Sequence, residues 1–175
     1  MRLEMTADWQ ALESQLLGLA EGYARLAELV DDQRRLIGRA DPSGLAEVGL
    51  RIEMQWRQLV GLENARRQAC LRLAERLGLA VASPGTVRME AFIRLAGEPW
   101  AGRLRQAVDR LTGQAQRVTQ GGQANLNAAR RLSGFCGELL GRVSRVGRET
   151  GCYNARGQRA LAREPIGMFN LSMVG

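Results

Sequence analysis

The side chains that most often perform catalysis are absent from this sequence or lack partners in it. The chain contains no histidine and no lysine, so the commonest general base, the commonest metal ligand and the lysine of a P-loop are all missing. The serines have no histidine to activate them. Paired carboxylates occur at Asp31 and Asp32, but on the solvated face of an expected helix. We therefore predict no enzyme, no catalytic or metal site, no cofactor and no small-molecule substrate.

The cysteines and the hydropathy of the chain indicate where such a protein would reside. Cys70, Cys136 and Cys152 are too widely spaced for a C-x-x-C metal or redox motif, and their odd number favours reduced thiols. The first residues carry acids and no apolar signal segment. No run approaches ~18 apolar residues, the length of a membrane span. We expect a cytoplasmic protein without membrane insertion.

The net charge of +7 arises in the C-terminal part of the chain. Residues 1–97 hold 13 arginines and 13 acids, whereas residues 98–175 hold 12 arginines and 5 acids. Few aromatic residues interleave with these arginines, and no recognition motif is visible. A solvated basic face is therefore favoured over nucleic-acid binding, which stays as an alternative. The arginines of this face are Arg103, Arg105, Arg110, Arg117, Arg130, Arg131, Arg142, Arg145 and Arg148.

The elements that must position these side chains are predicted by heptads, in which apolar residues recur at alternating steps of three and four. One series runs from Met5 to Ile37 with Gln33 as a polar interruption, and predicts a helix over 7–39 with Thr6 or Asp8 as its cap. A second series, which includes Trp56, runs over 45–77 and is followed by Gly78 as a C-terminal cap. The turn at 41–44 between them is short, so we expect residues 5–77 to form an elongated antiparallel hairpin.

The rest of the chain predicts a short helix over 86–97, capped by Thr86, and a long helix over 99–148 with Pro99 in its first turn. The seam of the long helix passes through Gly122 and Asn125. Each interior glycine costs about 1 kcal/mol relative to alanine, so we expect a weak point at Gly121–Gly122 and a dynamic distal half. The prediction is a single all-α, coiled-coil-like domain over 1–157 and a flexible tail over 158–175.

The distal half of the long helix is broadly apolar but poorly suited to packing on its own. Such a helix is a candidate for receiving the amphipathic helix of a partner, with plain intramolecular packing as the alternative. A structural coiled-coil oligomer is a further alternative. The predicted partner-binding residues are Asn125, Leu126, Leu132, Phe135, Leu139, Leu140 and Val143.

The order of these features resembles the FlgN-type flagellar export chaperones. The resemblance rests on the heptad hairpin, the short threonine-led helix, the pair Asn125 and Asn127, and the signature from Tyr153 to Gly157. It implies a cytoplasmic chaperone that binds a terminal helix of hook-associated (hook–filament junction) flagellar proteins, of the FlgK and FlgL type, through its C-terminal helical region. It also implies delivery of this cargo to the type III export apparatus.

Overall fold

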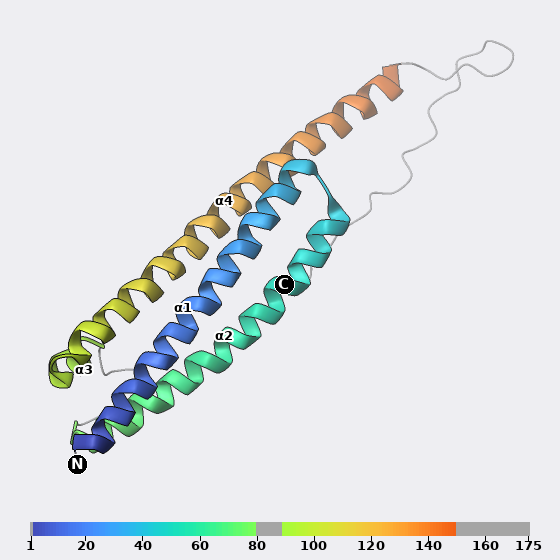
Figure 1. Cartoon of the computed structure of the whole chain (residues 1–175). Helices are drawn as coiled ribbons and strands as arrows, with labels where there is room; N and C mark the ends of the chain where they lie inside the picture. The colour runs from blue at the N-terminus through green and yellow to red at the C-terminus, as the bar shows by residue number, and fades with distance from the viewer. Residues whose placement is uncertain (1, 80–88, 150–175) are drawn as a thin grey trace, which may run out of the picture. The chain divides into compact units, whose positions relative to one another are not determined.

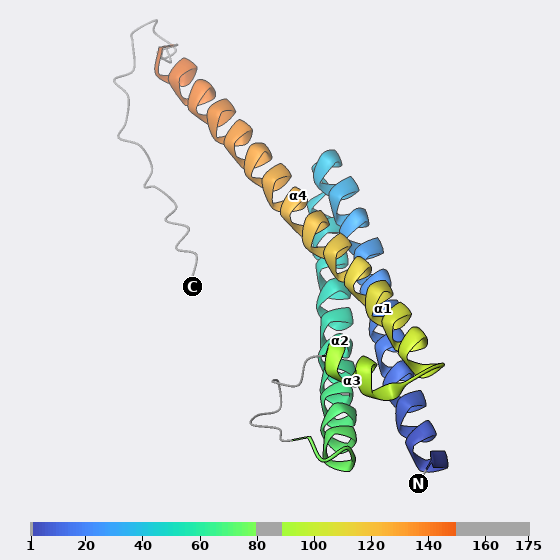
Figure 2. The same cartoon turned by 90° about the vertical axis from the view of Figure 1, so that its left-hand side faces the viewer.

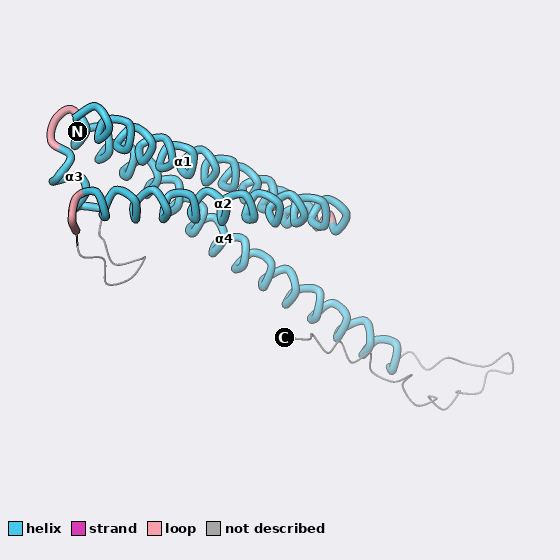
Figure 3. Tube along the Cα trace, turned by 90° about the horizontal axis from the view of Figure 1, so that it is seen from below, coloured by secondary structure: helices cyan, strands magenta, loops and turns pink. Residues whose placement is uncertain are grey.

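The computed structural model describes residues 2–79 and 89–149 as four helices, and within these ranges the regular structure is helical throughout (Figures 1 and 3). The helices are α1 (Arg2–Arg39), α2 (Pro42–Arg76), α3 (Met89–Ala96) and α4 (Trp100–Glu149). The predicted all-α class is confirmed. The chain divides into two compact units, residues 1–129 and 130–175, and the boundary falls within α4. No helix among the described residues is both long and apolar enough to cross a membrane.

Helices α1 and α2 form the expected antiparallel hairpin (Figure 1). Asp41 is the N-cap of α2 and accepts a 3.0 Å hydrogen bond from the amide of Gly44, while Pro42 occupies the first turn, where its missing N–H costs nothing. Gly78 follows α2 with a φ of 65° and closes its end, because its amide and that of Leu79 bond back to carbonyls of the last turn. The capped turn explains why the hairpin could be predicted from sequence.

The two helices of the hairpin are in tight contact beside Gly22. A Cβ atom on Gly22 would lie 2.7 Å from a methyl of Leu59, so no larger residue fits there without a shift. The amide of Gln55 is buried at this contact and donates a 3.2 Å hydrogen bond to the Gly22 carbonyl. The prediction that Trp56 continues the buried seam was wrong: Trp56 is 51% exposed. The close contact admits the flat amide of residue 55, and the indole of residue 56 lies outside it.

Helix α4 runs alongside α1 in the same direction over residues up to 129 (Figure 2). Arg103 pairs with Glu13 at 2.6 Å near the start of both helices, and Arg117 pairs with Asp31 at 2.7 Å further along. Phe92 of α3 is fully buried in the core at this starting end. Helix α1 therefore has α2 on one side and α4 on another, and it supplies the core leucines Leu12, Leu16, Leu19 and Leu26.

Two predicted details of the helices differ from the structure. Helix α1 begins at Arg2, so Thr6 and Asp8 lie within it and do not cap it, and Asp8 pairs with Arg76 across the hairpin. Helix α4 is continuous through Gly121–Gly122, and the weak point expected there stays a prediction. It begins at Trp100, one residue after the proline expected in its first turn. Residues 80–88, with the predicted cap Thr86, and the predicted tail 158–175 lie outside the described residues.

Candidate partner-binding surface

Asn125 lies in a buried polar cluster between α1 and α4. Its amide nitrogen donates to the carbonyl of Val30 at 2.8 Å and to the side-chain oxygen of Gln33 at 2.9 Å. Its amide oxygen accepts from Arg34 at 3.2 Å, and Arg34 also donates to the carbonyl of Gly121 at 3.4 Å. Asn125 is only 4% exposed. We name these five residues the Asn125 cluster, and their contacts join α4 to α1.

Gly121 explains how the backbones can come close enough for these bonds. A Cβ atom at this position would lie 2.7 Å from a methyl carbon of Val30, whereas a Cβ on Gly122 would meet open space. The seam therefore passes through Gly121, and the prediction that it passes through Gly122 was wrong. Two adjacent glycines lie about 100° apart on a helix, and neither has a side chain whose polarity would show which one is buried.

Helix α4 carries a set of exposed apolar side chains within the second unit. Phe135 is 58% exposed, Leu139 43%, Leu140 68% and Val143 68%, while Leu132 is half-buried. At about 100° per residue these five side chains fall within roughly 140° of the helix circumference. We call them the distal stripe. An apolar stripe of this width is typical of a helix face that packs against another helix.

The glycines of this part of α4 lie on the side away from the distal stripe. Gly134, Gly137 and Gly141 cluster within roughly 60° on the opposite face, as the helical period of 3.6 residues dictates. A Cβ atom at any of the three would meet nothing within 4 Å. No contact among the described residues therefore requires glycine at these positions, and what remains is their low helix propensity.

A family model described as FlgN protein matches residues 5–160 of the chain. The chain belongs to the FlgN family. Flagellar export chaperones make up this family, so the resemblance inferred from the motifs is confirmed. Neither the search of curated proteins nor the search of solved structures found a match.

The FlgN match spans every residue that the sequence analysis singled out as a signature or as a partner contact. Asn127 is exposed, and its amide oxygen accepts from Gln123 at 3.3 Å within the same helix. Leu126 is 45% exposed and belongs to the first unit, whereas the distal stripe belongs to the second. Tyr153 and Gly157 lie outside the described residues. That these side chains contact a partner stays a prediction.

Nothing in the sequence predicts that Arg34, Gln33 and Val30 hold Asn125 in place. A signal was present for Gln33, because it interrupts an otherwise apolar seam, and a polar residue at a seam position often specifies one packing arrangement. In the structure the polar partner of Gln33 is Asn125 of α4. The register of α4 on α1 cannot be read from the sequence, so this pairing could not be predicted.

Proposed function

We propose that this FlgN-family chain is an export chaperone for hook-associated flagellar proteins, and that the distal stripe holds the terminal amphipathic helix of the cargo. The observation that carries the proposal is a contiguous apolar face, exposed on α4 in a chain of a chaperone family. Burying this face against a second helix would remove apolar surface from water at about 25 cal/mol per Å².

The arginines beside the distal stripe suit an acidic cargo helix. Arg131 and Arg142 are exposed, and helical geometry places both next to the Phe135 edge of the stripe. Carboxylates along one border of the cargo helix would meet these guanidinium groups at the rim of the contact. Rim charges of this kind contribute mainly to the association rate and to orientation. Delivery of the cargo to the type III export apparatus in the cytoplasm completes the proposal.

The structure argues against the nucleic-acid alternative at two arginines of the basic face. Arg103 and Arg117 form ion pairs with carboxylates of α1, and Arg103 also lies over the ring of Trp100 at 4.4 Å. These two guanidinium groups are used in packing α4 against α1. A nucleic-acid complex would lose affinity steeply with salt, whereas a complex made through the distal stripe should persist.

Leu140→Arg tests the proposal directly. The probe is the purified terminal segment of a hook-associated protein, titrated into the full chain and followed by fluorescence anisotropy. We expect Leu140→Arg to weaken binding at least about tenfold, because a charge would enter the apolar contact. Leu50→Arg is the matched control, since Leu50 is 64% exposed on α2. Wild-type affinity in the Leu140 variant would refute the assignment.

Cys136 offers a second readout of the same contact without a substitution. Its thiol is exposed, and helical geometry places it within the distal stripe, between Leu132 and Leu140 in angle. The thiol of Cys70 is half-buried, and burial raises its pKa. Alkylation mapped by mass spectrometry should therefore modify Cys136 faster than Cys70. Bound cargo should slow the reaction of Cys136 but not that of Cys70.

A further inference from the structure

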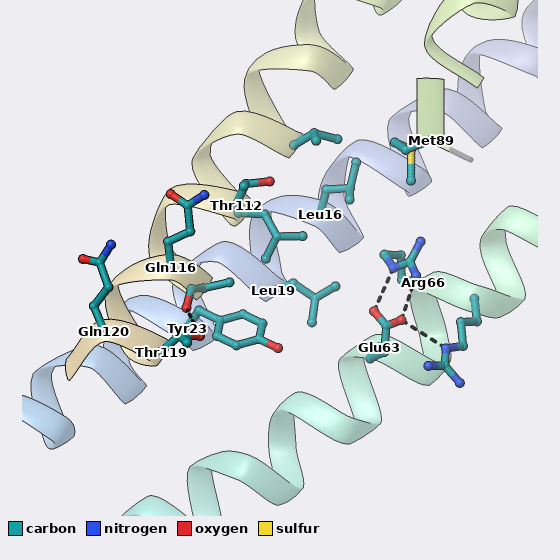
Figure 4. Close-up of a pocket in the computed structure, with 14 residues that line it drawn as sticks. Leu16, Leu19, Tyr23, Glu63, Arg66, Met89, Thr112, Gln116, Thr119 and Gln120 are labelled. Atoms are coloured by element: carbon teal, nitrogen blue, oxygen red, sulfur yellow. Dashed lines mark hydrogen bonds and ion pairs between the residues drawn. The ribbon is translucent and has the colours of Figure 1, made fainter. Parts of the chain in front are cut away.

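The first unit contains a large cleft that the proposed cargo site does not use. It has a volume of about 890 Å³ and lies between α2 and α4, with α1 beneath it (Figure 4). Leu16, Leu19 and Tyr23 of α1 form its floor in the close-up, between the two flanking helices. We call it the α2–α4 groove.

About half of the side chains that line the groove are apolar, and the described part of the chain covers several of these only in part. Leu16 and Leu19 are almost fully buried, but Tyr23, Val108 and Leu111 are half-buried. Met89 at the start of α3 is half-buried as well. Among the described residues, three helices surround this seam and no fourth helix covers it, as in an incomplete four-helix bundle.

A second hollow of about 190 Å³ extends the groove along α2. The two hollows share the lining residues Tyr23, Glu63 and Arg67. The second also includes Trp56 and Val60, which are 51% and 48% exposed. The indole that the heptads placed in the core thus lines the second hollow, and Tyr23, Glu63 and Arg67 lie where the two hollows meet.

The dimensions of the groove match a short helix. Its α4 wall extends from Val108 to Gln120, and the α2 wall of the groove and the second hollow together extends from Trp56 to Arg67. At 1.5 Å per residue these walls are about 18 and 16 Å long, which corresponds to about three turns of a helix.

The two walls differ in charge. On α2, Arg66 and Arg67 share one carboxylate, that of Glu63, at 2.7 and 3.0 Å. The hydrogen bond from Arg66 lowers the pKa of Glu63, so this carboxylate stays ionised and the wall keeps one net positive charge. The α4 wall presents only uncharged side chains to the groove: Val108, Leu111, Thr112, Ala115, Gln116, Thr119 and Gln120.

From these features we infer that the α2–α4 groove binds an amphipathic helix of a partner protein, about three turns long. Its apolar stripe would cover Tyr23 and Leu111, its carboxylates would lie along the α2 wall beside Arg66 and Arg67, and uncharged polar residues would face the α4 wall. This site lies in the first unit and is separate from the distal stripe, which lies in the second unit. It does not depend on the distal stripe or on the cargo assigned to it.

Synthetic peptides test this inference on the full chain. Three labelled 14-residue amphipathic peptides share one leucine–alanine stripe and one glutamine border, and carry glutamate, glutamine or arginine along the other border. We expect the glutamate peptide to bind about fivefold more tightly than the glutamine peptide, and the arginine peptide to bind more weakly still, as measured by anisotropy. Equal binding of all three would overturn the inference.

Matched substitutions locate the binding in the groove. Gln116→Glu places a carboxylate on the α4 wall, across the groove from Arg66 and Arg67, and should weaken the glutamate peptide about twofold, whereas Gln106→Glu, also exposed on α4 but outside the groove, should not. Arg67→Ala should weaken it about fivefold. Arg57→Ala is its control, because Arg57 also pairs with a glutamate four residues earlier on α2.

Two outcomes of these experiments would overturn the inference. The first is an equal effect of Gln116→Glu and Gln106→Glu, which would mean that the peptide binds elsewhere. The second is a dimer in sedimentation that Gln116→Glu dissociates, which would make a second copy of the chain the occupant. All four substituted residues are exposed, and circular dichroism checks that the helices are retained.

Discussion

The amide of Asn125 makes three hydrogen bonds to α1 from a nearly inaccessible position. Asn125→Ala removes all three and leaves the carbonyl of Val30 and the half-buried side chain of Gln33 without this partner. Loss of buried hydrogen-bond partners costs about 1–3 kcal/mol. We expect the free energy of unfolding in urea to fall by about that amount.

Asn127 provides the control for this experiment two residues further along the same helix. It is exposed, and its recorded hydrogen bond joins it only to Gln123 of the same helix. Asn127→Ala should change the free energy of unfolding by less than about 0.5 kcal/mol. If both variants were equally stable, the Asn125 cluster would not hold α4 against α1.

At the scale of single residues, Asn125 lies in a different setting from the one that the sequence suggested. It was predicted among the partner contacts, whereas its amide is fully used within the chain. A heptad pattern shows that a position faces a neighbour, but not whether the neighbour is another helix of the same chain. In the proposed function Asn125 positions α4, and the exposed leucines of the distal stripe contact the cargo.

The glycines of distal α4 lower the stability of this helix by an amount that can be measured. Changing Gly134, Gly137 and Gly141 together to alanine meets no steric obstacle. Each change should stabilise the helix by up to about 1 kcal/mol, because glycine has the larger conformational entropy to lose. Hydrogen exchange of amides in 130–145 should slow by more than tenfold, while exchange in α2 should not change. Unchanged exchange in 130–145 would show that the glycines do not limit its stability.

At the scale of elements, the bounds of α2 were predictable because chemical signals mark them. Asp41, Pro42 and Gly78 mark the ends of α2 through capping and backbone geometry. The start of α1 was predicted too late, because Thr6 and Asp8 are residues of capping type that lie inside the helix. The heptad pattern also could not show that Gln55 is buried and Trp56 exposed. The close contact at Gly22 decides this, and it exists only once the two helices are packed together.

For the whole molecule, the absence of histidine predicts a stability that hardly depends on pH near neutrality. No side chain in the chain has an ordinary pKa between about 5 and 8, so the free energy of unfolding should be nearly constant from about pH 5.5 to 7.5. Urea titrations across this range measure it. A slope within the range would require a strongly shifted group.

Below this range the same titrations should show a loss of stability. The hydrogen bond from Arg66 holds the pKa of Glu63 below its ordinary value in the folded chain. A lowered folded pKa contributes stability that is present above the unfolded pKa of about 4.3 and is lost as the pH falls through the folded value. Glu63→Gln should therefore have a shallower acid dependence than the wild-type chain.

The arrangement of the whole first unit was only partly predictable. Composition and heptads predict helices, and the short turn predicts the hairpin. They do not predict that α4 lies beside α1 and runs in the same direction. An apolar seam shows that one face of a helix is buried, but not which other helix buries it. The α2–α4 groove is a consequence of that arrangement, so no residue pattern in the sequence predicts it.

The contact between Gly121 and Val30 has a consequence for how the chain can change over time. The two positions share one methyl-sized volume, so a methyl gained at 121 must be given up at 30. Gly121→Ala alone is expected to be unfavourable, and Val30→Ala beside it should recover much of the loss. Substitutions at these two sites are therefore contingent on one another, although the two residues lie far apart in the chain.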